Sequence, residues 1–404
     1  MTSLDQLLSN TLRNIKFSEA QRLILDQAPK VRSESVKIHS ATNRTLAKGL
    51  VAKRDSPAGA VSAMDGYALR HADLSSDLIV RGQTKAGESA GVSLERGAAC
   101  RVFTGALLPK GADTVLVQED ANVSNGRLVP KSLPKFGAFV RPKGFDFQRG
   151  EELLSSGQKL TPAAIALCAA ANVDRIEIAR KPRIAIISTG NELCEPGMAK
   201  NSEDVVSSNG LALSALLENA GAESSNMGLV GDNVAELSKI LHSAKNHDLI
   251  ITTGGASVGD YDLVQTALQA LGGKPTFWQV MVRPGKPVFL WELQGTPVLG
   301  LPGNPVSALV CGRVFAMPWV RRALGQNPEI ERTIPFQLAK EIKQNGPRHQ
   351  FARAILKDGL ALITESQDSS LIKTLHRANL LIERPPHDKA RAKGEIVQCL
   401  VLQN

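Results

Sequence analysis

From residue 182 to about residue 325, apolar segments with the character of strands alternate with segments that have the length and pattern of helices. The expected strands lie in RIAIIST, DLIITTGG and PVLGLPGN, and the expected helices lie in SNGLALSALLENAG, YDLVQTALQALGG and the apolar stretch after residue 305. This alternation predicts a parallel-rich sheet with helices on both faces. Sheets of this kind bind ligands at the carboxyl ends of their strands.

Different patterns flank this α/β region. Residues 5–27 have the apolar spacing of one or two helices, and residues 160–173 predict a helix that begins with a Thr-Pro pair. Between about 50 and 150, short strand-like segments are separated by Gly and Pro, which predicts a β-rich unit. From about residue 330 onward, strands without long helices indicate a small β domain.

Length, charge and composition narrow the function classes. The 404 residues are 43% hydrophobic, enough for roughly two to four domains with cores of their own. The formal net charge is +9, but the basic residues are dispersed and aromatic residues make up only 4%, so a small anionic ligand is favoured over nucleic acid. Five cysteines without a CxxC pair fit a reducing cytoplasm. We expect neither a secretory signal nor a membrane span, because no apolar run approaches roughly 18 residues.

Three loops after expected strands carry small polar and turn-forming residues: STGNEL at 188–193, TTGGASVGDYD at 252–262 and GLPGNPVSAL at 300–309. Glycine lets backbone amides approach a ligand, and a helix start leaves N–H groups free, so an oxyanion can bind there. Each loop alone is equally consistent with an ordinary turn, but three at one sheet edge favour a shared anion site. The predicted binding residues are Ser188, Thr189, Gly190, Gly254, Gly255, Ser257, Pro302, Gly303, Asn304 and Ser307.

Charged residues near these loops indicate how an anion would be held. Carboxylates beside a phosphate-binding loop repel the ligand unless a cation lies between them, so we expect Mg²⁺ with Asp232 and Asp262 as ligands. The alternatives are that Asp262 caps a helix and that Glu192, in the first loop, is a solvated surface group. Arg283 and Lys286, in RPGKP, offer two fixed cations, although Pro-Gly is also a common turn dipeptide.

Familiar cofactor and hydrolase motifs are missing from the sequence. It has neither a GxGxxG after a strand nor a GxxxxGK[ST] loop, and it has no HExxH pair. A dinucleotide fold, a P-loop and histidine-centred hydrolysis are therefore unsupported. SAMDGYA at 62–68 lies far from the sheet in sequence: it is consistent with a simple turn, and it could reach the anion site only from elsewhere, for example from a second subunit.

Six blocks occur in order between residues 62 and 309: SAMDGYA, FTGALLPKGADTVLVQED, STGNEL, TTGGASVGDYD, RPGKP and GLPGNPVSAL. Together they resemble the molybdopterin molybdenumtransferase family of the MoeA type, which is related to the E domain of gephyrin. The resemblance implies a homodimer and a Mg²⁺-dependent reaction in which adenylated molybdopterin and molybdate give molybdenum on the dithiolene, with release of AMP. It also implies four domains: a mixed N-terminal linker and dimerisation domain (1–50 with 150–180), a β-rich inserted domain (51–149), a central α/β/α molybdopterin-binding domain (181–326) and a C-terminal β-barrel (327–404).

The same resemblance implies roles for individual residues. Asp65 and Thr104 match functional positions of the second domain, which are expected to face the cleft of the partner subunit. The acidic positions of the α/β domain are matched by Glu192, Asp232 and Asp262, and its anion-binding loops by Lys286 and Ser307. In the last domain, RHQFARA makes Arg348 a candidate molybdate contact, and Ser369 matches a serine of a second loop. The implied catalytic set is Asp65, Glu192, Asp232, Asp262 and Lys286.

Two classes of function remain open from the sequence alone. The first is the transferase, and the second is a molybdopterin-binding scaffold of the same fold without turnover. A nucleic-acid binder, favoured only by the positive charge, is the weaker third. The expected partners are small anionic substrates, a second copy of the chain and other proteins of molybdenum cofactor biosynthesis, in the cytoplasm and without nucleic acid or membrane.

Overall fold

The computed structural model describes residues 11–88, 91, 93–254, 263–328 and 333–402. The chain divides into two compact units, and each is described by itself. Unit 1 contains Met1–Glu34, Asn43–Ala47 and Glu177–Asn404, and unit 2 contains Ser35–Thr42 and Lys48–Ile176. Strands β2 (Ser33–Lys37) and β13 (Arg175–Ala179) contain two of the boundaries between them.

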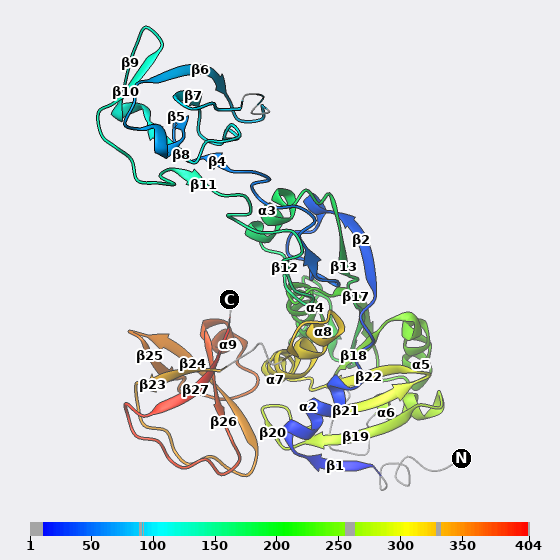
Figure 1. Cartoon of the computed structure of the whole chain (residues 1–404). Helices are drawn as coiled ribbons and strands as arrows, with labels where there is room; N and C mark the ends of the chain where they lie inside the picture. Colours follow the sequence, from blue (N-terminus) through cyan, green and yellow to red (C-terminus); the bar gives the residue numbers. More distant parts are fainter. Residues whose placement is uncertain (1–10, 89–90, 92, 255–262, 329–332, 403–404) are drawn as a thin grey trace. The chain divides into compact units, whose positions relative to one another are not determined.

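A seven-stranded sheet forms the centre of unit 1, in the order β1-β19-β21-β22-β18-β14-β17 (Figure 1). The four strands β22, β18, β14 and β17 run parallel, as predicted, whereas β21 pairs antiparallel with both of its neighbours. The bounds are β1 Leu12–Ile15, β14 Arg183–Thr189, β17 Glu223–Val230, β18 Leu249–Thr253, β19 Lys274–Val280, β21 Phe289–Leu293 and β22 Thr296–Leu301.

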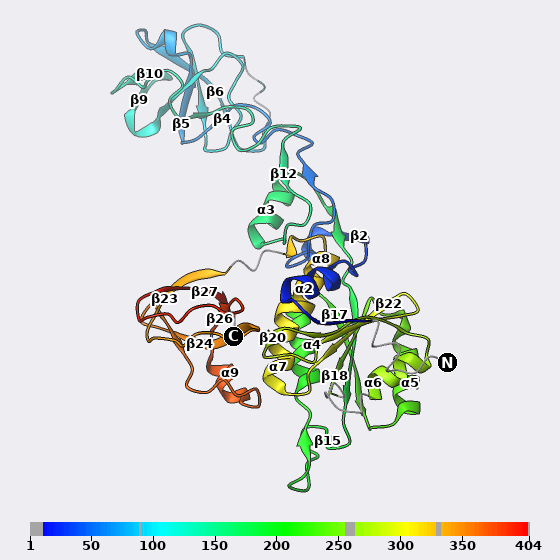
Figure 2. The same cartoon turned by 90° about the horizontal axis from the view of Figure 1, so that it is seen from below.

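Helices cover both faces of this sheet, which confirms the expected α/β architecture (Figure 2). Alternate residues of a strand point to opposite faces, so Ile184 and Ile186 join one apolar core while Ala185 and Ile187 join the other. The first core includes residues of α2 (Phe17–Leu25), α4 (Asn209–Asn219), α7 (Pro305–Cys311), the π-helical η5 (Gly312–Ala316) and α8 (Met317–Ala323). The second includes residues of α5 (Val234–Ser243) and α6 (Leu263–Ala270).

Two sequence-based expectations for this unit were wrong or incomplete. Leu12 was expected on a helix, but Leu12–Ile15 forms β1, which pairs parallel with β19 at the edge of the sheet. Three residues of β1 pair with β19 there, and this tertiary pairing overrides a weak local helix pattern. The strands β17, β19 and β21 were not predicted individually, because their sequences show no clean alternation between apolar and polar positions. The helix α5 was also not predicted, although Val234, Leu237 and Leu241 have helical spacing and Asn233 caps the helix.

Unit 2 is β-rich, as predicted, and contains one clear α-helix among its described residues. That helix is α3 (Pro162–Ala170), and the side chain of Thr161 accepts a hydrogen bond from the amide of Ala164 at its start. A six-stranded sheet has the order β8-β5-β7-β6-β10-β9. The bounds in this unit are β3 Leu50–Val51, β4 Val61–Ser62, β5 Gly66–Leu69, β6 Leu78–Thr84, β7 Ala98–Val102, β8 Thr114–Val117, β9 Ala121–Ser124, β10 Arg127–Pro130, β11 Val140–Arg141 and β12 Glu152–Leu154.

The C-terminal part of unit 1 is a small barrel, as expected. Its strands pair in the order β24-β25-β23-β27-β26, and an additional pairing between β24 and β26 closes the ring. A short strand of the α/β part, β20 (Val282–Arg283), pairs parallel with β24. The bounds are β23 Ile334–Leu338, β24 His349–Lys357, β25 Leu360–Ile363, α9 Ile372–Arg377, β26 Leu380–Arg384 and β27 Ile396–Val401. Within the described ranges, no helix has both the length and the apolar character needed to cross a bilayer.

Candidate active site

Three neighbouring parallel strands, β14, β18 and β22, end beside one another, because Ser188 pairs with Thr253 and Thr253 pairs with Leu301. The loops that follow these strands line a single cavity of about 800 Å³. The lining residues that the sequence predicted are Ser188, Thr189, Gly190, Glu192, Asp232, Gly254, Pro302, Gly303 and Asn304. Gly255, Ser257 and Asp262 were also predicted and lie outside the described residues.

Glycine is required where two of these loops approach each other. Gly254 has a φ of +91°, and a Cβ atom there would lie 2.2 Å from the carbonyl oxygen of Thr189. A Cβ on Gly303 would lie 3.4 Å from the Cα atom of Gly254. The backbones of the second and third loops are therefore close enough to contact one small ligand together.

Buried hydroxyl groups lie at the ends of these strands. The hydroxyls of Ser188, Thr189 and Thr252 have no hydrogen-bond partner among the described residues, although all three side chains are buried. By contrast, Thr253 Oγ1 donates to the carbonyl oxygen of Pro302 at 3.1 Å. Ser188 and Thr189 line the cavity, whereas Thr252 is not among the lining residues. Buried polar atoms normally have partners, so the unpaired donors of Ser188 and Thr189 are available to a ligand or to ordered water.

Asn209 also lines the cavity, and the sequence analysis missed it. Its Nδ2 donates to Thr253 Oγ1 at 2.9 Å and to the carbonyl oxygen of Gly303 at 2.7 Å, so one carboxamide connects the second loop to the third. The available sequence signal was the Ser-Ser-Asn-Gly run before an apolar helix, which indicates a helix start. That signal gives no information about partners that lie 44 and 94 residues away.

Two exposed carboxylates, Glu192 and Asp232, line the same cavity. The amide of Asp232 donates to Asn191 Oδ1 at 2.8 Å, which connects the first loop to the segment after β17. Within the described ranges, no group of three or more His, Cys, Asp or Glu side chains could hold a metal ion. Two carboxylates beside unpaired hydroxyls nevertheless fit Mg²⁺, which binds through one or two carboxylates together with substrate phosphate oxygens.

The start of α7 differs from the expected free anion site. The amide of Val306 donates to the carbonyl oxygen of Ser369 at 3.1 Å, and Asn304 Nδ2 donates to Ser369 Oγ at 3.0 Å. One of the expected free donors is thus already used by the barrel. Ser307 is only 4% exposed and is absent from the cavity lining, because the helix turns its side chain inward.

The predicted cations lie near the junction of the α/β part and the barrel. Lys286 is exposed and precedes Pro287, which lines the cavity. Arg283 lies on β20 opposite Gln350 of β24, close to Arg348. Burial lowers the pKa of Arg348, and repulsion by the positive charge of Arg283 lowers it further. In the part of the chain that the structure describes, no ion pair or hydrogen bond neutralises either guanidinium.

Asp65 and Thr104 belong to unit 2, whereas the cavity belongs to unit 1. Both the amide and the hydroxyl of Thr104 donate to Asp65 Oδ1, at 2.7 and 2.8 Å. These two hydrogen bonds lower the pKa of Asp65. Ser62 Oγ also donates to the carbonyl oxygen of Met64, so side-chain hydrogen bonds hold the turn that carries Asp65.

The fold and the cavity define a class: a multidomain α/β and β protein with a ligand pocket at the carboxyl edge of its central sheet. Family models match in three consecutive parts. Residues 15–172 match the MoeA N-terminal region (domain I and II), residues 185–322 match a probable molybdopterin binding domain, and residues 335–402 match the MoeA C-terminal region (domain IV).

Similar proteins agree with this division. A molybdopterin molybdenumtransferase from Nostoc sp. is 38% identical over 95% of this chain and 93% of its own length, and one from Haemophilus influenzae is 33% identical over 77% and 78%. Two solved structures of the molybdopterin biosynthesis MoeA protein from Pyrococcus horikoshii, 28% and 25% identical, cover 97% and 96% of this chain and all of their own, with TM-scores of 0.86 and 0.83. The chain belongs to the molybdopterin molybdenumtransferase family and is an enzyme of that type.

Proposed function

We propose that this enzyme transfers molybdenum from molybdate to adenylated molybdopterin and releases AMP. The observation that carries the proposal is the single cavity, in which three loops, unpaired hydroxyls and two carboxylates meet. Backbone amides and hydroxyls suit the phosphate groups of an adenylated pterin, and the nearby cations suit a dianion such as molybdate. The names of the relatives support the same reaction class.

Each group has a proposed role. Thr189, Gly190, Gly254 and Gly303 bind the phosphates of the pterin substrate, together with Gly255 and Ser257 of the loop outside the described residues. Glu192, Asp232 and Asp262 would hold Mg²⁺, which when bound neutralises charge on the phosphoanhydride. The proposed molybdate contacts are Arg283, Lys286, Arg348 and Ser369.

We further propose that the enzyme is a homodimer in the cytoplasm, that Asp65 and Thr104 are functional positions of unit 2, and that other proteins of the biosynthetic route bind it. The four-domain division given above is proposed on the same basis. Sedimentation of the purified chain tests the dimer directly, since a monomer at micromolar concentration would contradict it.

The test of the reaction is AMP release from adenylated molybdopterin when molybdate and Mg²⁺ are added. Glu192→Gln removes a cavity carboxylate, and Lys286→Ala removes a cation. Each should slow AMP release about 10- to 100-fold, the usual effect of losing an interaction with a charged group. Glu292→Gln, an exposed glutamate on β21 that is not among the cavity-lining residues, is the matched control and should leave the rate unchanged. Binding of the pterin substrate without AMP release by the wild type would contradict the proposal.

A further inference from the structure

The peptide bond between Arg348 and His349 is fixed from both sides. On one side, Asn345 Nδ2 donates to the carbonyl oxygen of Arg348 at 2.9 Å. On the other side, the amide of His349 donates to the carbonyl oxygen of Met281 at 2.9 Å. Because both polar groups of one peptide plane are engaged, the plane cannot rotate freely, and the direction in which the Arg348 side chain leaves the backbone is restricted.

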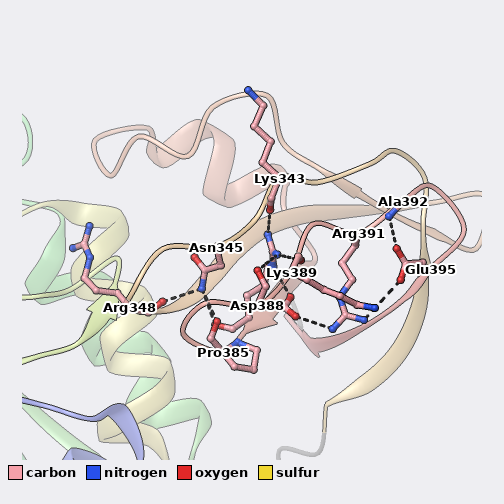
Figure 3. A network of polar contacts seen from close by, with 10 residues as sticks. Lys343, Asn345, Arg348, Pro385, Asp388, Lys389, Arg391, Ala392 and Glu395 are labelled. Carbon is pink, nitrogen blue, oxygen red and sulfur yellow. Dashed lines mark hydrogen bonds and ion pairs between the residues drawn. The ribbon is translucent and has the colours of Figure 1, made fainter.

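Asn345 is itself held in place by the loop after β26. It is 8% exposed, and its amide donates to the carbonyl oxygen of Asp388 at 2.8 Å. Its Nδ2 lies 2.7 Å from the carbonyl oxygen of Pro385 and 3.3 Å from that of Arg384. One carboxamide therefore joins the segment before β24 to the segment after β26 (Figure 3).

A buried guanidinium holds this second segment. Arg384 is 4% exposed, and it donates to Asp388 Oδ2 at 2.9 Å, to the carbonyl oxygen of Lys343 at 2.6 Å and to that of Lys389 at 2.8 Å. Arg391 donates to the other carboxylate oxygen of Asp388 at 2.7 Å. Burial raises the pKa of Asp388, but the hydrogen bonds from Arg391 and Arg384 outweigh it, so the net pKa is lowered and the carboxylate stays charged.

The cluster of Asn345, Arg384 and Asp388 stabilises a close arrangement of two arginine side chains that electrostatic repulsion alone would oppose. Arg283 lies on β20, and Arg348 directly precedes β24, with which β20 pairs, so the two guanidinium groups repel each other. Two mobile guanidinium groups would move apart in water, and an incoming anion would have to bring them back together. Groups that are already held in the binding geometry lose less free energy when the ligand arrives.

We propose that Asn345 is a positioning residue for Arg348, and that the cluster of Asn345, Arg384 and Asp388 keeps the Arg348 guanidinium beside Arg283, ready for a tetrahedral oxyanion dianion. The inference rests on the proposed function, in which that dianion is molybdate. Asn345 does not contact the anion. It acts through the backbone of Arg348.

The test measures molybdate binding to the full-length protein by equilibrium dialysis, and the molybdate concentration that gives half-maximal AMP release. Arg348→Ala should weaken binding by about 10- to 100-fold, because a contact between charged groups is lost. Asn345→Ala should weaken it by about three- to tenfold and raise the half-maximal molybdate concentration, while the maximal rate stays within about twofold. In the Arg348→Ala background, Asn345→Ala should cause no further loss, because the two residues act as a unit.

Controls separate positioning from a general loss of stability. Asn379→Ala removes the hydrogen bond that the amide of Leu356, at the other end of β24, donates to Asn379 Oδ1, and it should leave molybdate binding unchanged. Asn345→Gln keeps the amide donors and should recover most of the affinity. If Asn345→Ala does not fold, Asn345→Ser, whose hydroxyl can still donate to one carbonyl, replaces it.

The outcomes also separate this inference from the proposed function. Wild-type affinity in Asn345→Ala, equal losses in Asn345→Ala and Asn379→Ala, or additive losses in the double variant would each overturn the positioning role, even if AMP release is normal. If the wild type releases no AMP but dialysis shows the expected pattern, the proposed reaction fails and the inference stands. Unchanged binding in Arg348→Ala would overturn the inference and the molybdate role of Arg348.

Discussion

At the scale of single residues, the carboxylate of Asp65, which lies outside the cavity, is held in a fixed position by hydrogen bonds. The amide and hydroxyl of Thr104 both donate to the same oxygen, and together they lower the pKa of Asp65. A carboxylate with a lowered pKa favours the folded state above its unfolded pKa, and this contribution is lost as the pH falls through the folded pKa. The side chain is therefore charged at neutral pH.

We predict that Thr104→Val raises the pKa of Asp65 toward its ordinary value, because the hydroxyl donor is removed while the backbone donor remains. Titration of the Asp65 carboxyl carbon by NMR measures this shift. Thr104→Ser keeps the hydroxyl and is the control, so its titration should follow the wild type. An identical Asp65 pKa in Thr104→Val and the wild type would show that the hydroxyl bond does not form in solution.

The sequence identified many candidate residues but not their neighbours. Arg283 and Arg348 could each be chosen from local motifs, yet their closeness depends on the pairing of β20 with β24. Asn209 and Asn345 could not be found in this way, because Asn209 contacts a carbonyl group 94 residues away, and Asn345, which bonds the nearby Arg348 carbonyl, is held in place by Pro385, 40 residues away. A carboxamide in a polar segment has no distinctive local signal.

At the scale of elements, the close approach of the backbone at the ends of β14 and β18 requires a glycine, Gly254. Gly254 combines a φ of +91° with a backbone contact that leaves no room for a Cβ atom. Gly272, after α6, has a similar φ of +78°, but no atom lies within 4 Å of the position that a Cβ atom would take there. An alanine substitution at each glycine therefore distinguishes two costs. At Gly272 only the backbone conformation is strained, whereas at Gly254 the Cβ atom also clashes with the backbone.

We predict that Gly272→Ala lowers the free energy of unfolding by about 1–2 kcal/mol, the cost of a left-handed conformation for a residue with a Cβ atom. Gly254→Ala should lower it by about 1–3 kcal/mol more, because the methyl group meets the Thr189 carbonyl. Both glycines lie in unit 1, so the urea-induced unfolding transition of that unit in the two variants measures the difference. Equal losses of unfolding free energy in the two variants would mean that the loops after β14 and β18 move apart easily, which contradicts close packing of these loops at the edge of the sheet.

The prediction for the N-terminal segment was wrong at this same scale. Leu12–Ile15 is a strand because β19 offers an unpaired edge, and the segment that follows is the predicted helix, α2. Short segments carry too little local preference to resist such pairing. Longer patterns, such as that of α3, were confirmed. In α3 the capping Thr161 and the apolar residues that follow it both favour a helix.

At the scale of the whole molecule, the chain has two compact units with separate apolar cores. We predict that thermal unfolding is not two-state, because each unit can lose its core independently. Differential scanning calorimetry should give a calorimetric enthalpy larger than the van't Hoff enthalpy. A single transition with equal enthalpies would show instead that the units unfold as one.

The sequence by itself determined the alternation of strands and helices, the three glycine-bearing loops and the family, because periodicity and turn chemistry are local properties of the chain. Only the tertiary structure decided that the loops share one cavity, that Ser369 occupies the start of α7, and that Asn345 holds Arg348. The cavity and the Ser369 contact join residues far apart in the chain, and Asn345, although only three residues from Arg348, is itself held by Pro385, 40 residues away. The formation of these contacts depends on which strands pair and on how the barrel closes, and no short stretch of sequence specifies either.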